Sequence, residues 1–163
     1  MSSSIGFPMP KSLIVDETTE TPTYAKFPAQ PLQRGFGHTL GNSLRRVLLS
    51  SLDGAAICSV RIDNAKHEFD AIDNVLEDIT EIVLNLKCVK LNIHAEGPKT
   101  LEIVKDKAGA VTAADIVCDS TVEVLNPEQL ICTLDKDKKF HAVIEVVNGR
   151  GYLPAEENTA PRA

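Results

Sequence analysis

Several features that identify whole classes of protein are missing from this sequence of 163 residues. Its first residues, Met1-Ser2-Ser3-Ser4-Ile5-Gly6, contain neither a basic segment nor a sustained apolar run, which argues against a secretory signal peptide. No stretch approaches the roughly 18 consecutive apolar residues that a membrane helix needs. We therefore expect a cytoplasmic protein that makes no contact with a membrane.

Cysteine pairs with the spacing of a metal site are also missing. The four cysteines are Cys58, Cys88, Cys118 and Cys132, and no two of them form a C-x-x-C pair. Because a protein without an export signal stays in a reducing compartment, we predict buried free thiols, in preference to a disulfide or a metal site.

Residue patterns that would indicate catalysis are missing as well. His67-Glu68 begins like a zinc-protease helix, but no second histidine follows at the required spacing. No serine lies in a nucleophile elbow. A cluster of acidic residues precedes and enters a predicted helix, where the helix dipole favours negative charge, and comprises Asp70, Asp73, Glu77, Asp78 and Glu81. We expect no catalytic residue, no metal ligand and no cofactor in this chain.

Negative charge is missing from one segment of an otherwise acidic chain. The formal net charge is -6, yet no Asp or Glu occurs from Lys26 to Leu52, where Arg34, Arg45 and Arg46 add further positive charge. The overall negative field would repel phosphate groups, so we expect no direct contact with DNA.

The hydrophobic periodicity predicts an α+β protein with mostly antiparallel sheets and two main helices. The first helix is expected to begin at Thr39 as N-cap and to end at Asp53-Gly54, and the second to begin at Asn74, with Glu77 completing a capping box. Short alternating or apolar runs predict strands over residues 13–15, 24–27, 58–62, 89–95, 101–103, 122–124, 130–134 and 142–146.

A glycine-rich segment, Gly35 to Gly41, precedes the first predicted helix and is similar to a dinucleotide-binding fingerprint. Its spacing is G-x-G-x-x-x-G, however, and two prolines stand where a buried strand should precede it. A small phosphate- or nucleotide-binding enzyme that uses this turn remains an alternative. It would need an acid, a base or a metal ligand nearby, and the segment from Lys26 to Leu52 offers only His38.

The first predicted helix has apolar residues on more than one side. Its main stripe consists of Leu40, Leu44, Val47, Leu48 and Leu52, and Leu49 points away from that stripe. Such a helix is either a core helix packed on two sides or a helix that packs on its own sheet and on a partner protein. In the second case an arginine beside Leu49 could anchor the partner through bidentate contacts.

Six blocks of this sequence, in the same order, resemble the N-terminal region of the bacterial RNA polymerase alpha subunit. The longest block is PLQRGFGHTLGNSLRRVLLSS, residues 31–51. The others are HEF at 67–69, EDI through LNLK at 77–87, VTAADI at 111–116, VLNPE at 124–128 and GRGYLPA at 149–155.

The resemblance implies a dimerisation domain that is interrupted by an inserted β-rich domain. It implies a mobile N-terminus at residues 1–11, part of the dimerisation domain at 12–53, the inserted domain at 54–155 and a frayed tail at 156–163. It also implies a function. In that family the alpha dimer forms first and recruits the beta and beta-prime subunits, and the polymerisation chemistry belongs to beta-prime.

The same resemblance assigns individual residues to partners. The dimer-facing residues would be Phe36, Leu40, Leu44 and Val47. Arg46 and Leu49 would contact the beta subunit, which matches the second apolar side of the helix. Lys87 and the loop from Gly109 to Ile116 would lie near the large subunits.

The sequence departs from the family pattern after Ala155. There the family returns to the dimerisation domain with further strands and a second long helix, and a separate C-terminal domain contacts promoter DNA. We therefore expect a truncated alpha-like chain. It would recruit other protein to cover its first helix, associate with itself, or be a non-functional fragment of a longer subunit.

Overall fold

The computed structural model describes residues 8–158, which form parts of two compact units. The first unit is Met1–Ser50 and the second is Ser51–Ala163. The predictions for residues 1–7 and 159–163 lie outside the described residues. No helix in the described part of the chain is long and apolar enough to cross a membrane.

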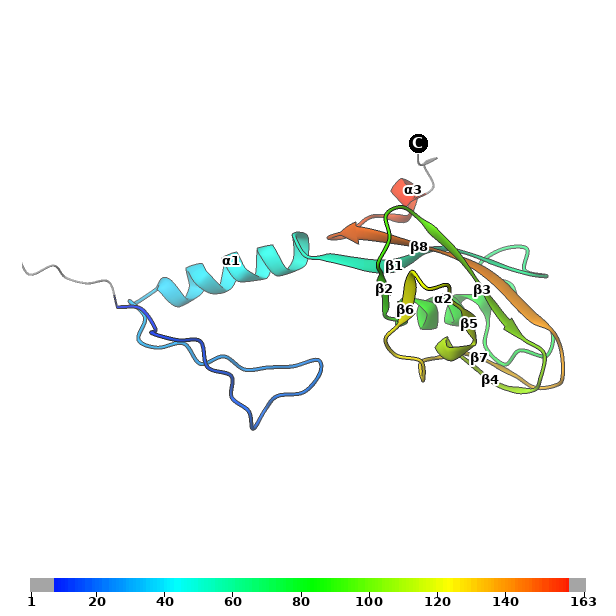
Figure 1. Ribbon diagram of the computed structural model, residues 1–163, viewed down its shortest axis with the longest axis horizontal. Helices are drawn as coiled ribbons and strands as arrows, with labels where there is room; N and C mark the ends of the chain where they lie inside the picture. Colours follow the sequence, from blue (N-terminus) through cyan, green and yellow to red (C-terminus); the bar gives the residue numbers. More distant parts are fainter. Residues whose placement is uncertain (1–7, 159–163) are drawn as a thin grey trace, which may run out of the picture. The chain divides into compact units, whose positions relative to one another are not determined.

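Over residues 8–50, unit 1 contains one regular element, the helix α1 at Phe36–Ser50 (Figure 1). Gly35 precedes it with a φ of +86°, a left-handed conformation that favours glycine. Two details of the prediction are wrong. The helix begins three residues before Thr39, and it ends at Ser50, so Asp53 and Gly54 belong to the next strand.

The segment before α1 contains no regular strand among residues 8–35, so the strands predicted at 13–15 and 24–27 are wrong. One antiparallel bridge joins Thr21 to Tyr24, and the amide of Asp16 donates to the carbonyl of Lys26 at 2.9 Å. Short apolar runs need a neighbouring strand to satisfy their backbone groups. The structure provides none for these residues.

Unit 2 is α+β with antiparallel pairing throughout, as the periodicity predicts (Figure 1). Its strands are β1 Asp53–Ile62, β2 Leu91–Ile93, β3 Lys99–Lys105, β4 Gly109–Thr112, β5 Ile116–Val117, β6 Val122–Val124, β7 Leu130–Leu134 and β8 Phe140–Arg150. Its helices are α2 Ile79–Lys87, the 3₁₀ turn η1 Ala113–Asp115 and the short α3 Ala155–Asn158.

The strands form a six-stranded sheet in the order β5-β3-β8-β1-β2-β6 and a separate two-stranded sheet, β4-β7. The long strand β8 is central, and it pairs with β1 on one side and with β3 on the other. The alternation along β8 buries Ala142, Ile144 and Val146, which meet apolar residues of the neighbouring strands. One core results, and every buried residue of the described chain belongs to unit 2.

Helix α2 covers this core with Ile79, Ile82 and Leu86. It begins later than predicted: Asp78 is the N-cap and accepts a hydrogen bond from the amide of Glu81 at 2.7 Å. Asn74 lies outside the helix with a φ of 63°. Tertiary contacts override the local periodicity here, because the amide of Leu76 donates to the carbonyl of Thr133.

The cysteine prediction is right on the thiols and partly wrong on burial. No disulfide joins any two of the four cysteines, all of which lie in the described part of the chain, but only Cys132 is buried, whereas Cys88 and Cys118 are exposed. Burial, with Glu77 and Asp115 nearby, raises the pKa of the Cys132 thiol to about 12. That thiol is therefore held in its protonated, unreactive form.

Candidate functional site

The apolar residues that the resemblance assigns to the dimer face form a stripe along one side of α1. Phe36 and Leu40 are half-buried, whereas Leu44 is 60% and Val47 53% exposed, and no residue of the helix is buried. At about 100° per residue these four side chains lie within one quarter of the helix circumference. A monomeric protein seldom leaves such a row uncovered, so this stripe is the first candidate for an interaction surface.

Leu49 lies on a different side of α1, and its side chain is 64% exposed. Leu44 and Leu49 nevertheless border one hollow of about 360 Å³, together with Gly41, Arg45 and Leu48. Gly41 has no side chain to fill the hollow beside Leu44 and Leu48, which follow it by three and seven residues on the same face of the helix. The structure thus brings together two residues that the resemblance assigns to different partners.

The arginines of α1 are available for a partner. Arg45 and Arg46 are both exposed, and no ion pair found within residues 8–158 involves either of them. An unpaired guanidinium beside exposed leucines can form bidentate bonds to a carboxylate without first breaking an internal pair.

The glycine segment does not form a phosphate-binding loop. Gly37, His38 and Gly41 lie inside α1, so the glycines belong to a helix and do not form the strand–turn–helix loop of a dinucleotide fingerprint. His38 is exposed and is the only residue in this segment that could act as an acid or base. The geometry therefore disfavours the nucleotide-binding alternative.

Lys87 lies in the last turn of α2, and its side chain is exposed. Leu84, three residues earlier, is exposed on the same helix, whereas Ile82 and Leu86 point into the core. The loop predicted from Gly109 to Ile116 is more regular than expected, because it contains β4, η1 and the first residue of β5.

The acidic cluster has structural roles. Glu77 accepts hydrogen bonds from the amide and the hydroxyl of Thr133 at 2.6 and 2.9 Å. Asp70 accepts from the amides of Lys66 and Ala71, and these bonds lower the pKa of its carboxyl. Among residues 8–158 no group of three His, Cys, Asp or Glu side chains could hold a metal ion.

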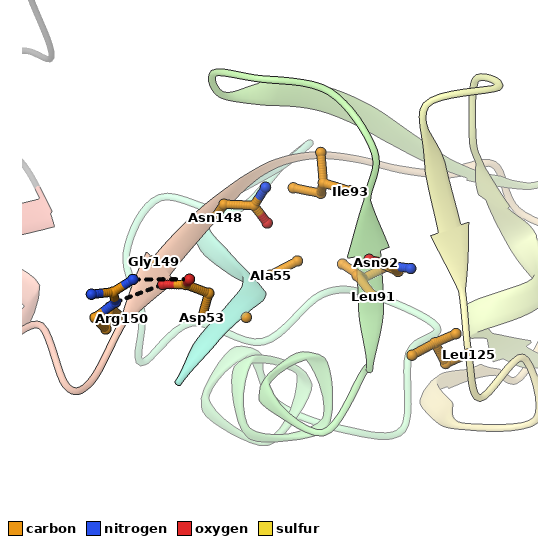
Figure 2. A pocket seen from close by; sticks show the side chains of 10 residues that line it. Asp53, Ala55, Leu91, Asn92, Ile93, Leu125, Asn148, Gly149 and Arg150 are labelled. Atoms are coloured by element: carbon orange, nitrogen blue, oxygen red, sulfur yellow. Dashed lines mark hydrogen bonds and ion pairs between the residues drawn. The ribbon is translucent and has the colours of Figure 1, made fainter. Parts of the chain in front are cut away.

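A second candidate site, which the sequence did not predict, is a groove of about 700 Å³ in unit 2 between β1 and β2 (Figure 2). The two strands pair only at Ala55 and Leu91, so they separate on one side of this pair. The groove is lined by Asp53, Gly54, Ala55, Leu91, Asn92, Ile93, Leu125, Asn148, Gly149 and Arg150.

A bidentate ion pair lies at the rim of this groove (Figure 2). Arg150 Nε donates to Asp53 Oδ1 at 2.6 Å, and Arg150 Nη2 donates to Oδ2 at 2.9 Å. These hydrogen bonds, with the attraction of opposite charges, lower the pKa of the Asp53 carboxyl and raise the pKa of the Arg150 guanidinium. No signal in a single sequence pairs two residues that lie so far apart along the chain.

Comparisons with known proteins identify relatives of this chain. The model of the RNA polymerase Rpb3/RpoA insert domain family matches residues 60–163. A DNA-directed RNA polymerase subunit alpha from Oceanobacillus iheyensis is 56% identical over 142 residues, which cover 87% of this chain and 45% of the relative.

Two further relatives carry the same name. The protein from Syntrophus aciditrophicus is 52% identical over 148 residues, covering 91% of this chain and 43% of the relative. The protein from Alkaliphilus metalliredigens is 52% identical over 144 residues, covering 88% of this chain and 46% of the relative. The chain therefore spans less than half the length of these curated relatives.

Proposed function

Because this chain belongs to the RNA polymerase Rpb3/RpoA insert domain family, we propose that it acts as a non-catalytic assembly subunit of a bacterial DNA-directed RNA polymerase. Its task would be to hold other subunits together in the cytoplasm, while beta-prime carries out nucleotidyl transfer. The name that the relatives share supports the proposal that the chain is part of an RNA polymerase. The exposed helix α1 supports the proposed assembly role.

The observation that carries this proposal is that unit 1 by itself leaves no side chain of α1 buried. Leaving the exposed side chains of Leu44, Val47 and Leu48 in water costs on the order of 4.5 to 9 kcal/mol, at about 1.5 to 3 kcal/mol each. That amount is comparable to the whole stability of a small domain. A binding partner that covers the stripe would recover much of it.

The proposed contacts follow the two sides of α1. Phe36, Leu40, Leu44 and Val47 would pack against a second copy of the chain. Arg46 and Leu49 would bind the beta subunit, and both are exposed and available. In this scheme residues 12–53 belong to a dimerisation domain and 54–155 to an inserted domain.

The large subunits would also contact unit 2. Lys87, on the outer side of α2, and the segment from Gly109 to Ile116 are the proposed contacts. We propose no contact with DNA from this chain, because residues 51–163 contain 20 Asp and Glu against 12 Lys and Arg.

Co-purification with the beta subunit tests the assignment of Arg46. If this side chain is a hot spot, Arg46→Ala should weaken capture of beta by about 2 kcal/mol or more, roughly a 30-fold loss of affinity. The matched control is Arg61→Ala, which removes an exposed arginine from β1 in unit 2. Thermal melting of both variants checks that unit 2 remains folded.

Equal capture of beta by Arg46→Ala and by the unmodified chain, with the fold intact, would remove Arg46 from the interface. Failure of every form to capture beta would argue that this length of chain does not assemble with that subunit.

A further inference from the structure

The outer end of the β1–β8 pair contains two glycines directly opposite each other. The last three pairs in the register are Ala55 with Asn148, Gly54 with Gly149, and Asp53 with Arg150. Cross-strand side chains stabilise a sheet, and a glycine in a strand contributes none. At the pair of Gly54 and Gly149, only the backbone holds the two strands together.

Neighbouring strands give this end little support. Strand β8 pairs with β3 only as far as Val146, so Asn148, Gly149 and Arg150 have β1 as their single strand neighbour. Strand β1 pairs with β2 only at Ala55. The last pairs therefore form a two-stranded ribbon that extends beyond the sheet, and an isolated two-stranded ribbon is marginally stable in water.

Neither glycine is required by its backbone or by its surroundings. Both have φ values that other residues adopt readily, and an added Cβ would meet no atom within 4 Å at either position. The property that glycine adds here is conformational freedom.

The ion pair of Asp53 and Arg150 lies immediately beyond this flexible point. Its two hydrogen bonds, at 2.6 and 2.9 Å, join the first residue of β1 to the last residue of β8. The Asp53 and Arg150 side chains are 71% and 60% exposed, so the pair contributes little to global stability. A bidentate ion pair can nevertheless hold the two strand ends together locally. Without it, this end of the ribbon opens when only one further pair of residues, Gly54 and Gly149, separates.

We propose that Gly54 and Gly149 form a joint in the β1–β8 ribbon, and that the Asp53–Arg150 ion pair is the latch that keeps the joint closed. Because all four residues line the groove between β1 and β2, opening the latch moves one wall of that groove. The device goes beyond the proposed assembly function, because it needs only the residues of unit 2.

Hydrogen–deuterium exchange of the 163-residue chain tests this proposal. In Asp53→Ala, peptides that cover residues 52–57 and 147–152 should exchange about two- to fivefold faster, while a peptide over 99–105 is unchanged. Adding 1 M salt to the unmodified chain should accelerate exchange in the same two peptides, because salt screens an exposed ion pair.

A rescue variant distinguishes two explanations of faster exchange in Asp53→Ala: release of a flexible ribbon, and the loss of a single contact. Replacing both Gly54 and Gly149 by Thr adds a cross-strand side-chain pair and should restore slow exchange in the Asp53→Ala background. The control is Lys105→Gln, which removes the 2.7 Å ion pair with Asp115 elsewhere in unit 2 and should leave both peptides unchanged.

Three results would overturn the proposal. They are unchanged exchange at 52–57 and 147–152 in Asp53→Ala, equal acceleration throughout unit 2, and failure of the two threonines to slow exchange.

Discussion

Helices α1 and α2 both carry an apolar stripe at helical spacing, yet the structure covers only one of them. Helix α2 buries Ile79, Ile82 and Leu86 under the sheet of unit 2, and Asp78 caps its first turn. Helix α1 has more residues but buries none. The pattern of apolar residues therefore predicts a helix in both cases, and what covers the helix depends on the rest of the chain or on a partner.

The largest expected effect comes from truncating matched residues of the two helices. Ile82→Ala should lower the free energy of unfolding of unit 2 by about 2 to 5 kcal/mol, because Ile82 is fully buried. Leu44→Ala, on exposed α1, should leave that free energy unchanged. Chemical denaturation of the two variants at low protein concentration measures both values. Equal losses would contradict the distinction between a covered and an uncovered helix.

A smaller effect should follow from the loss of the hydrogen bonds that hold the chain just before α2. Glu77 accepts two hydrogen bonds from Thr133 on β7, and both bonds are partly buried. Glu77→Ala should therefore destabilise unit 2 by about 1.5 to 3 kcal/mol, as expected for bonds to a charged group. The control Glu81→Ala changes an exposed carboxylate four residues later, inside α2. A similar melting temperature for the two variants would show that the bonds to Thr133 contribute little.

The helix caps offer a third comparison, with a smaller effect. Asp78→Ala removes the side chain that accepts from the amide of Glu81, and should cost about 1 kcal/mol. Thr39→Ala should have no such effect, because Thr39 lies inside α1 and does not cap it. Circular dichroism melts of the two variants check this difference. A larger loss for Thr39→Ala would restore the N-cap that the sequence predicted.

The smallest expected effect is a dependence of the stability of unit 2 on acid pH. Hydrogen bonds hold the pKa values of Asp70 and Asp119 below their usual range. Their contribution is thus complete above the unfolded pKa of about 3.9 and is lost as the pH falls through the lowered folded values. The melting temperature of unit 2 should decrease as the pH is lowered below about 4. The decrease should be less steep in the double variant Asp70→Asn/Asp119→Asn. An identical pH profile for the variant would exclude these carboxyls as the cause.

The sequence predicted six of the eight strands described in unit 2 and missed the short strands β4 and β5, and its clearest success is the long, regular alternation of β8. Along residues 142–146 every second residue is buried, as the pattern requires. It predicted the start of α2 poorly, because Val75 and Leu76 continue the helical periodicity while their backbones bind β7. Local pattern carries no information about such distant partners.

The candidate sites also differ in how far the sequence could predict them. The exposed stripe and Leu49 followed from spacing on one helix, whereas the partners of Phe36, Arg46 and Lys87 came from resemblance and remain predictions. The groove between β1 and β2 was missed. It depends on the register of strands that lie far apart in the chain and on the position where β1 and β2 separate.

The central claim is that α1 is a binding surface, and light scattering of the chain with and without the beta subunit tests it most directly. The account predicts that the chain alone has a mass above that of one copy as concentration rises, and that with beta it forms a stable complex containing two copies. A single-copy mass at every concentration, together with no complex with beta, would contradict it.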